Sequence, residues 1–199
     1  IGRGFIQSVV REREQGGSFT SLQDFCDRMY DCGDMNKRAV ENLIRSGAFD
    51  SMGARRSQLL AVYEKVLDGI GNVRRRNVEG QIDFFGMSAA NSTVETVVMP
   101  DIPEFTATER MHMEKETTGL YLSGHPMVGY RAAARSSGAV TLNEILEDVS
   151  SEEGPTRFAD GMPVTVAGIV ASSKTRPTKN GTLMAYVVVE DETAAIELL

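Results

Sequence analysis

The first part of the chain places apolar residues three and four positions apart, the spacing of amphipathic helices. Capping residues coincide with the breaks: Ser21 and Asn36 precede apolar stripes, and Gly47 follows one. We therefore expect four helices within residues 1–68. Their apolar stripes are Phe5, Ile6, Val9 and Val10; Leu22, Phe25, Cys26 and Met29; Ala39, Val40, Leu43 and Ile44; and Leu59, Leu60, Val62, Tyr63, Val66 and Leu67.

This pattern breaks at about Gly69. Residues 69–104 are rich in Arg, Asn, Ser and Thr and lack helical periodicity, so we expect a linker there. Two capping boxes follow, at Thr106–Glu109 and at Thr141–Glu144. They predict short helices in a helical connecting segment over residues 105–160, which ends in an acidic loop.

The tail changes to the period of a β-strand. Val164, Val166, Gly168 and Val170 alternate with Thr165, Ala167 and Ile169, as in a largely buried strand. Residues 183–190 and 194–199 are predicted to form two more strands. Asn180-Gly181 is a strong hairpin signal between the first two. The predicted fold class is mainly α, followed by a β portion over residues 161–199. Three strands do not close a barrel, so we expect this portion to be incomplete.

Composition narrows the class of protein. The chain has 199 residues, 41% of them hydrophobic and 25% charged, which is typical of a globular protein. No apolar run is long enough for a membrane span, and no signal peptide is visible. The two cysteines indicate a reducing, cytoplasmic setting. The chain does not begin with Met, and we expect it to be a segment of a longer protein.

Charge is unevenly distributed along the chain. The net charge of −7 argues against non-specific nucleic-acid binding by the whole surface. Residues 1–80, however, hold 13 basic and 11 acidic residues, whereas residues 81–160 hold 5 and 13. The head and the acidic middle are therefore expected to have different partners.

A Gly-x-Gly turn at Gly2–Gly4 opens the first helix. Such a turn lets backbone amides approach a phosphate, as in a helix-hairpin-helix element that holds the DNA backbone without reading bases. The link at residues 45–49 could form a second hairpin. The alternative is a tight turn beside a solvated helical face. The candidate duplex-contacting residues are Gly2, Arg3, Gly4, Lys37, Arg38, Arg45, Gly47, Arg55 and Arg56.

Two further segments are candidate binding elements. Gln81, Ile82, Asp83, Phe84 and Phe85 place two aromatic residues in the predicted linker; they either dock into a partner's apolar pocket or pack on the helical head. Basic residues and an aromatic in the tail suit single-stranded nucleic acid, although a solvated hairpin tip has the same composition. The tail residues are Lys174, Arg176, Lys179 and Tyr186.

No catalytic constellation is present in the sequence. The run of carboxylates at residues 190–192 lies at one strand end, whereas a two-metal site needs groups from separate elements. His125 precedes a proline and has no partner at ligand spacing, which favours a structural role. The cysteines are expected to be buried or inert. We predict no catalytic residue, metal site or cofactor in this chain.

Several separated motifs resemble one family. Residues 117–126, Thr-Thr-Gly-Leu-Tyr-Leu-Ser-Gly-His-Pro, are similar to a signature of bacterial replicative DNA polymerase III alpha subunits of the DnaE type. Residues 17–26 and 36–50 resemble the tandem helix-hairpin-helix region of that family. Residues 178–191 resemble the opening strands of its OB-fold. The motifs occur in the family's order and cover essentially the whole chain.

The resemblance implies a non-catalytic C-terminal fragment of the polymerase. The head would bind duplex DNA, and the OB portion would bind single-stranded template. Residues 81–85 would bind the sliding clamp, with Gln81 as polar anchor and Phe84 and Phe85 as the apolar residues that enter the clamp's pocket. Other replisome subunits are further expected partners, and no membrane is. The polymerase carboxylates and their Mg²⁺ belong upstream of this chain. Two alternatives stay open: a helical protein-interaction module without a nucleic-acid role, and a hydrolase that uses His125.

Overall fold

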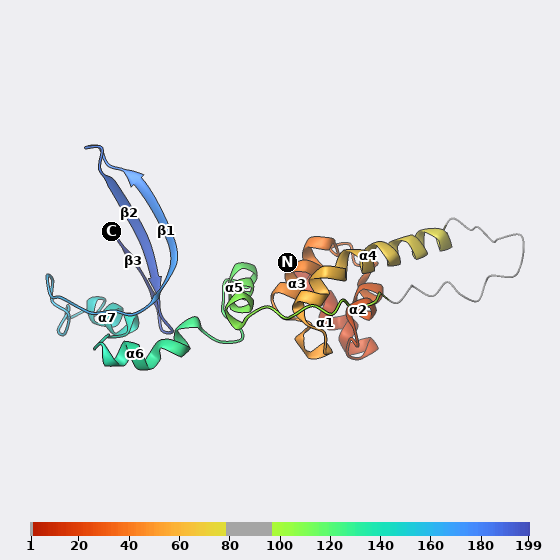
Figure 1. Ribbon diagram of the computed structural model, residues 1–199, viewed down its shortest axis with the longest axis horizontal. Coiled ribbons are helices and arrows are strands. Elements are labelled where there is room, and N and C mark those ends of the chain that lie inside the picture. Colours follow the sequence, from red (N-terminus) through yellow and green to blue (C-terminus); the bar gives the residue numbers. More distant parts are fainter. Residues whose placement is uncertain (1, 79–96) are drawn as a thin grey trace, which may run out of the picture. The chain divides into compact units, whose positions relative to one another are not determined.

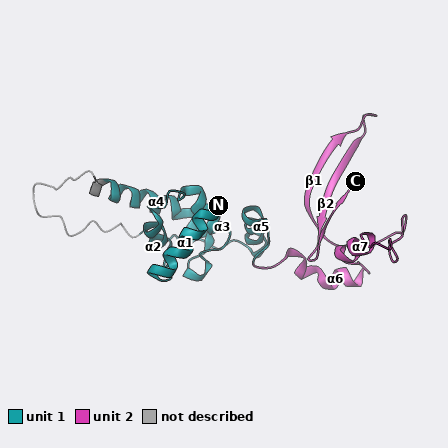
Figure 2. Cartoon of the chain, turned by 180° about the vertical axis from the view of Figure 1, so that it is seen from behind, with its two compact units in different colours: residues 1–122 teal, residues 123–199 magenta. Residues whose placement is uncertain are grey.

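The computed structural model describes residues 2–78 and 97–199, which form two compact units, residues 1–122 and 123–199 (Figures 1 and 2). Each unit is described separately. Unit 1 is helical, with α1 (Arg3–Gly16), α2 (Leu22–Met29), α3 (Lys37–Arg45), the short 3-10 helix η1 (Asp50–Met52), α4 (Arg56–Val78) and α5 (Ala107–Thr118). Unit 2 contains η2 (Pro126–Tyr130), α6 (Arg131–Ser136) and α7 (Leu142–Val149), followed by β1 (Ile169–Pro177), β2 (Leu183–Glu190) and β3 (Ala195–Leu198). The predicted fold class, a helical head followed by a small antiparallel sheet, is confirmed.

The helix ends of unit 1 follow from local side-chain chemistry. The Asp24 amide donates to Ser21 Oγ at 3.1 Å, and the Ala39 amide donates to Asn36 Oδ1 at 2.9 Å. Both caps satisfy amides that the first turn of a helix leaves free. Gly47 follows α3 with φ of 83°, a left-handed conformation that favours glycine.

One apolar cluster holds unit 1 together. Phe25 is its centre: its ring meets those of Phe19 and Phe49 edge to face, with both centroid distances at 5.0 Å. This geometry is favourable for aromatic pairs and adds to the burial of their surface. The predicted stripes of the helices supply most of the cluster. Its buried members are Phe5, Leu22, Phe25, Cys26, Met29, Ala39, Val40, Leu43, Ile44, Phe49, Leu59, Val62, Val66 and Ile70.

The end of α4 differs from the prediction. The helix continues through Val78, past the expected start of the linker at residue 69. Ile70 is fully buried, and Arg74 pairs with Asp27 and Asp31 while its guanidinium lies over the Tyr30 ring at 4.9 Å. Contacts with α2 and the residues just after it therefore stabilise the last part of α4. The sequence predicted a break there because this part contains two glycines and a run of polar residues.

The two predicted capping boxes are present. Thr106 and Glu109 cap α5, and Thr141 and Glu144 cap α7, each through reciprocal side-chain and backbone hydrogen bonds. The sequence did not predict α6, whose run of alanines carries no apolar stripe. His125 caps η2, because its Nδ1 accepts from the Met127 amide at 3.2 Å.

The sheet is an antiparallel meander of order β1-β2-β3. The predicted second and third strands are confirmed, and Gly181 sits in the hairpin turn with φ of 77°. The first strand is shifted: it runs over residues 169–177 rather than 164–170, because its register is set by pairing Pro177 with Leu183 across the turn. Val166 instead forms an isolated parallel bridge with Val140.

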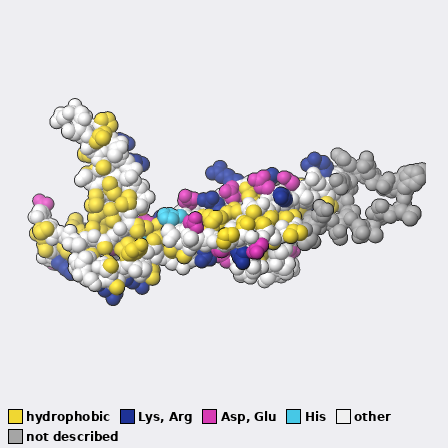
Figure 3. Space-filling view, viewed as in Figure 1, with side chains coloured by type: hydrophobic (Ala, Val, Ile, Leu, Met, Phe, Trp, Pro, Cys, Tyr) yellow, Lys and Arg dark blue, Asp and Glu magenta, His cyan; other side chains and the backbone are white. Residues whose placement is uncertain are grey.

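The sheet is also far less buried than its sequence pattern suggested. Val170 is 64% exposed and Leu183 is 76% exposed, and Figure 3 shows hydrophobic side chains at the surface of the sheet. The predicted burial of the first strand is therefore wrong in this structure.

Burial raises the pKa of the Cys26 thiol to about 12, in agreement with an inert cysteine inside the core. In the part of the chain that the structure describes, no helix combines the length and the apolar character needed to cross a membrane.

Candidate nucleic-acid interface

A hollow of about 280 Å³ lies where the start of α1 meets the start of α3. Phe5, 1% exposed, fixes the first turn of α1 to the core and forms the floor of the hollow. The hollow brings together two parts of the predicted DNA-contacting set that are more than 30 residues apart in sequence, the Gly-x-Gly turn and the start of α3. Its lining residues are Gly2, Phe5, Asp34, Asn36, Arg38, Ala39 and Asn42.

The first turn of α1 has backbone amides without side-chain caps. Gly2 is the N-cap residue and offers no side chain, and its carbonyl accepts from the Ile6 amide at 3.3 Å. Neither α1 nor α3 has an acidic residue in its first turn, so no carboxylate there offsets the positive end of either helix dipole. Two helix N-termini around one hollow favour an anion such as a phosphate.

Steric crowding within the protein does not require glycine at positions 2 and 4. A Cβ on Gly2 would meet nothing within 4 Å, and one on Gly4 would make only an ordinary contact, 3.9 Å from Asp34 Oδ2. Neither has a positive φ. The fold therefore tolerates larger residues here, whereas a ligand that approaches the backbone closely would not.

Two arginines beside the hollow are free to meet a ligand. Arg3 and Arg38 are exposed, and neither has a hydrogen-bond or ion-pair partner among residues 2–78 and 97–199. Asp34 also lines the hollow, so the arginines and amides must outweigh its carboxylate to hold an anion. The DNA-contacting role predicted for these two residues stays a prediction, and their exposed positions leave them accessible to a ligand.

Three other predicted contacts are engaged in ion pairs. Lys37 binds Glu64 and Asp68, with N–O distances of 3.0 and 3.2 Å, and these hydrogen bonds raise its pKa. Arg45 pairs with Glu116, and Arg55 pairs with Asp101 and donates to the Ile102 carbonyl at 2.7 Å. All three pairs lie at the surface, where a phosphate could compete for the cation.

Arg56 is buried, which corrects its prediction as a DNA contact. Its guanidinium is 3% exposed and pairs with Asp50 at 2.6 Å and with Glu114, itself fully buried, at 2.8 Å. Hydrogen bonds to Asp50 and Glu114 raise the pKa of Arg56 above its ordinary value. This network joins the start of α4 to η1 and α5, so Arg56 is structural.

Gly47 also has a structural role, because it leaves room for the Arg56 side chain. A Cβ at this position would collide with the guanidinium of Arg56. Its amide donates to Ile44 O and the Ala48 amide to Leu43 O, both at 3.0 Å, so this turn satisfies itself. The second predicted hairpin therefore offers no free amides at Gly47 and Ala48, in contrast to the turn at Gly2–Gly4.

In unit 2, the sheet places three of the four predicted single-strand contacts on one face. Lys174 lies opposite Tyr186 in the register, and the Arg176 guanidinium lies 6.0 Å from the Tyr186 ring centroid. Lys179 is exposed in the hairpin turn. Glu197 shares this face, since both it and Ser172 pair with Val188.

The predicted clamp-binding residues 81–85 lie outside the described residues. No three His, Cys, Asp or Glu side chains within residues 2–78 and 97–199 come together as a group that could hold a metal ion. Sequence reasoning missed Asn36 and Asn42 as lining residues of the hollow. Asn36 was recognised only as a helix cap, and Asn42, two turns into α3, carried no signal of its own.

Comparison with known proteins gives two concordant results. Residues 1–59 match a family model described as a helix-hairpin-helix motif. Over its whole length the chain is 32% identical to a DNA polymerase III subunit alpha of Vibrio cholerae and to one of Thermus aquaticus, and 31% identical to one of Mycobacterium tuberculosis. The chain spans about one sixth of these relatives, covering 16%, 15% and 16% of their lengths.

Proposed function

Since this chain is related over its whole length to a segment of the DNA polymerase III alpha subunits, we propose that it serves DNA replication by holding duplex DNA. The contact is to the sugar-phosphate backbone and is independent of base sequence. One phosphate binds at the hollow between α1 and α3, through the amides that follow Gly2 and the side chains of Arg3 and Arg38.

The observation that carries this proposal is the difference between the two predicted hairpins. At Gly2–Gly4 the amides and both nearby arginines are free, whereas at Gly47 the amides and Arg56 are engaged within the protein. The interface is accordingly smaller than the sequence suggested. Surface cations such as Lys37 and Arg45 can add contacts only by leaving their carboxylate partners.

The experiment is a fluorescence-anisotropy titration of the 199-residue chain with a labelled duplex over a range of salt concentrations. A footprint of two to four phosphates gives a slope of log K against log salt of roughly −2 to −4. Replacing Arg3 and Arg38 by Gln should weaken binding and bring that slope about 2 closer to zero.

The matched control is Arg11→Gln with Arg75→Gln, which removes the same charge from exposed parts of α1 and α4 away from the hollow. It should leave most of the binding intact. Equal weakening in both double variants would mean diffuse electrostatics instead of a site. No duplex binding at low salt would favour the alternative, a protein-interaction module, which the net charge of −7 also suits.

A second proposed contact is the sliding clamp, through Gln81–Phe85. It rests on the resemblance of this pentapeptide to a clamp-binding motif. We expect Phe85→Ala to abolish clamp binding and leave the melting temperature of the chain unchanged, measured by anisotropy with the purified clamp and by circular dichroism. A large fall in melting temperature would show that Phe85 belongs to the core.

The remaining functions follow the parent polymerase. The face of the sheet with Lys174, Arg176 and Tyr186 suits single-stranded template, and Lys179 extends it at the hairpin turn. Polymerisation and its Mg²⁺ are assigned to parts of the parent protein outside this chain, which we expect to be inactive alone. The expected place of action is the cytoplasm, at the nucleoid.

A further inference from the structure

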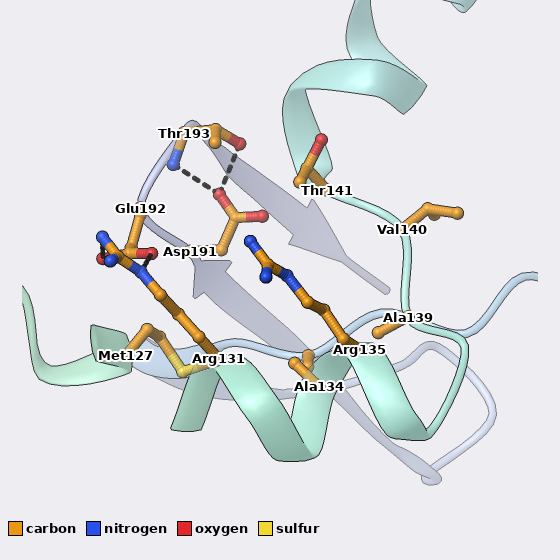
Figure 4. A pocket seen from close by; sticks show the side chains of 11 residues that line it. Met127, Arg131, Ala134, Arg135, Ala139, Val140, Thr141, Asp191, Glu192 and Thr193 are labelled. Atoms are coloured by element: carbon orange, nitrogen blue, oxygen red, sulfur yellow. Dashed lines mark hydrogen bonds and ion pairs between the residues drawn. The ribbon is translucent and has the colours of Figure 1, made fainter. Parts of the chain in front are cut away.

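A cavity of about 140 Å³ lies within unit 2, between α6, the loop before α7 and the turn that joins β2 to β3 (Figure 4). None of the proposed functions uses it. One side is apolar and the other charged. Its lining residues are Met127, Arg131, Ala134, Arg135, Ala139, Val140, Thr141, Ala167, Asp191, Glu192 and Thr193.

The two arginines of this cavity differ in what they bind. They lie one turn apart on α6. Arg131 forms a two-point pair with Glu192, with N–O distances of 2.5 and 2.7 Å. Arg135 has no hydrogen-bond or ion-pair partner in the described part of the chain, and its guanidinium extends toward Asp191 and Thr141 in Figure 4. Arg135 is thus a free donor at a cavity wall.

The two carboxylates of the cavity are already satisfied. Asp191 accepts from the amides of Leu142, Thr193 and Ala194 at 2.7, 2.7 and 2.9 Å, and from the Thr193 hydroxyl at 2.6 Å. Glu192 is held by Arg131. Neither carboxylate is therefore poised to take a cation, and the free polar group at this site is the Arg135 guanidinium.

The apolar side limits the size of what can enter. It consists of Met127, Ala134, Ala139, Val140 and Ala167. A cavity of roughly 150 Å³ holds a molecule the size of benzene, so this one accommodates a single branched aliphatic side chain. A ligand that matches both sides carries an anionic group directly beside a short aliphatic group.

We propose that this cavity docks an acidic–aliphatic segment of a partner protein, such as an Asp beside a Leu. The carboxylate binds Arg135, and the aliphatic side chain fills the wall formed by Ala134, Val140 and Ala167. A carboxylate and a guanidinium form strong, charge-assisted hydrogen bonds. The lining of the cavity includes none of the residues proposed to contact duplex or single-stranded DNA.

Charge favours a peptide over a nucleic acid as the occupant. Residues 123–199 hold six basic and ten acidic residues, and two carboxylates lie in the cavity itself. Because these two carboxylates lie in the cavity, a polyanionic backbone would be repelled there more strongly than a single carboxylate flanked by neutral residues. The single aliphatic compartment also suits a side chain better than a flat base.

The test is a titration of the ¹⁵N-labelled 199-residue chain, followed through the amide signals of Ala134, Val140 and Ala167. The probes are the blocked dipeptides acetyl-Asp-Leu-amide and acetyl-Leu-Asp-amide, their Asn analogues, inorganic phosphate and an oligothymidylate. We expect saturable changes in these amide chemical shifts with at least one Asp dipeptide. The Kd should be about 1 mM, because the probe is small.

The Asn analogues should bind about tenfold more weakly, and Arg135→Gln should remove that difference. Arg157→Gln, the same substitution on an exposed loop of the same unit, is the matched control and should behave as the unmodified chain. Absence of shifts with both Asp dipeptides would overturn the proposal. Equal binding of the Asp and Asn dipeptides would show that Arg135 does not bind the carboxylate. Stronger shifts with phosphate or oligothymidylate would show that the ligand is a nucleic acid and not a peptide.

Discussion

Basic side chains in unit 1 differ in what surrounds them. Arg3 and Arg38 point to solvent beside backbone amides, whereas Arg56 is enclosed by carboxylates and carbonyls. The neighbouring arginines 55 and 56 show how sharp the division is, since one is 47% exposed and the other 3%. Arg3 and Arg38 can exchange water for a phosphate directly, whereas a surface cation such as Lys37 must first leave its carboxylate partners.

Removal of the buried Arg56 guanidinium should strongly lower the free energy of unfolding. Arg56→Met removes the ion pair between Arg56 and the buried Glu114 carboxylate, and loss of one partner of a buried pair typically lowers the free energy of unfolding by about 3–5 kcal/mol. Urea denaturation measures this loss. Arg55→Met at the adjacent surface position should change the free energy of unfolding by no more than about 0.5 kcal/mol. Similar effects of the two substitutions would contradict the structural role of Arg56.

Four helices of this chain begin according to local rules, whereas the end of α4 depends on tertiary contacts. The caps at Ser21, Asn36, Thr106 and Thr141 all form as their sequences predict. The extension of α4 through Val78 depends instead on α2, which lies almost 50 residues earlier in the chain. Its contacts with Arg74 outweigh the low helix propensity of glycine.

Substitution of Gly4, at the second position of α1, should affect the stability of the fold and the affinity for duplex DNA in opposite directions. Gly4→Ala should raise the free energy of unfolding by up to about 0.5 kcal/mol, because a Cβ fits there and alanine favours the helix. In the proposed phosphate site the same methyl group would stand between the phosphate and the amides, so duplex affinity should fall about tenfold. Thermal unfolding and anisotropy report the two effects.

Gly69→Ala is the matched control for this substitution. Gly69 also lies within a helix and has open space around its Cβ position, but it is remote in sequence from the hollow. It should stabilise the chain to a similar degree and leave duplex binding unchanged. If Gly4→Ala likewise leaves the affinity unchanged, the backbone amides of α1 are not the contact.

At the scale of the whole molecule, the two units have unequal cores. Among the described residues of unit 1, fourteen buried hydrophobic residues form one cluster. The buried hydrophobic residues described in unit 2 are Met127, Leu142 and Phe158, and its sheet exposes several large apolar side chains. Since burial of apolar surface is the main favourable term in folding, the units should differ in stability.

We expect unit 2 to unfold at a lower urea concentration than unit 1. Hydrogen exchange read out by mass spectrometry as urea increases resolves the two, because peptides from α2 and from β2 report on separate units. Leu142→Ala should lower the free energy of unfolding of unit 2 alone, and Leu59→Ala that of unit 1 alone, each by about 2–5 kcal/mol. The urea midpoint of the affected unit should fall accordingly. A single shared transition would show that the units fold cooperatively.

The sequence by itself determined what depends on neighbours along the chain. It placed the helix caps, the apolar stripes of the helical head, the hairpin around Gly181 and the second and third strands. It also carried the resemblance to the alpha subunits, because short motifs in a fixed order survive at about 30% identity. These features follow from local hydrogen bonding and periodicity.

Only the tertiary structure decided which charged residues are free. An arginine has the same chemistry whether it faces solvent or a buried carboxylate, so no local pattern separates Arg38 from Arg56. Their surroundings come from Glu114 and other residues far along the chain. The cavity beside Arg135 was invisible for the same reason, because its walls come from three segments between residues 127 and 193 that meet only when the chain folds.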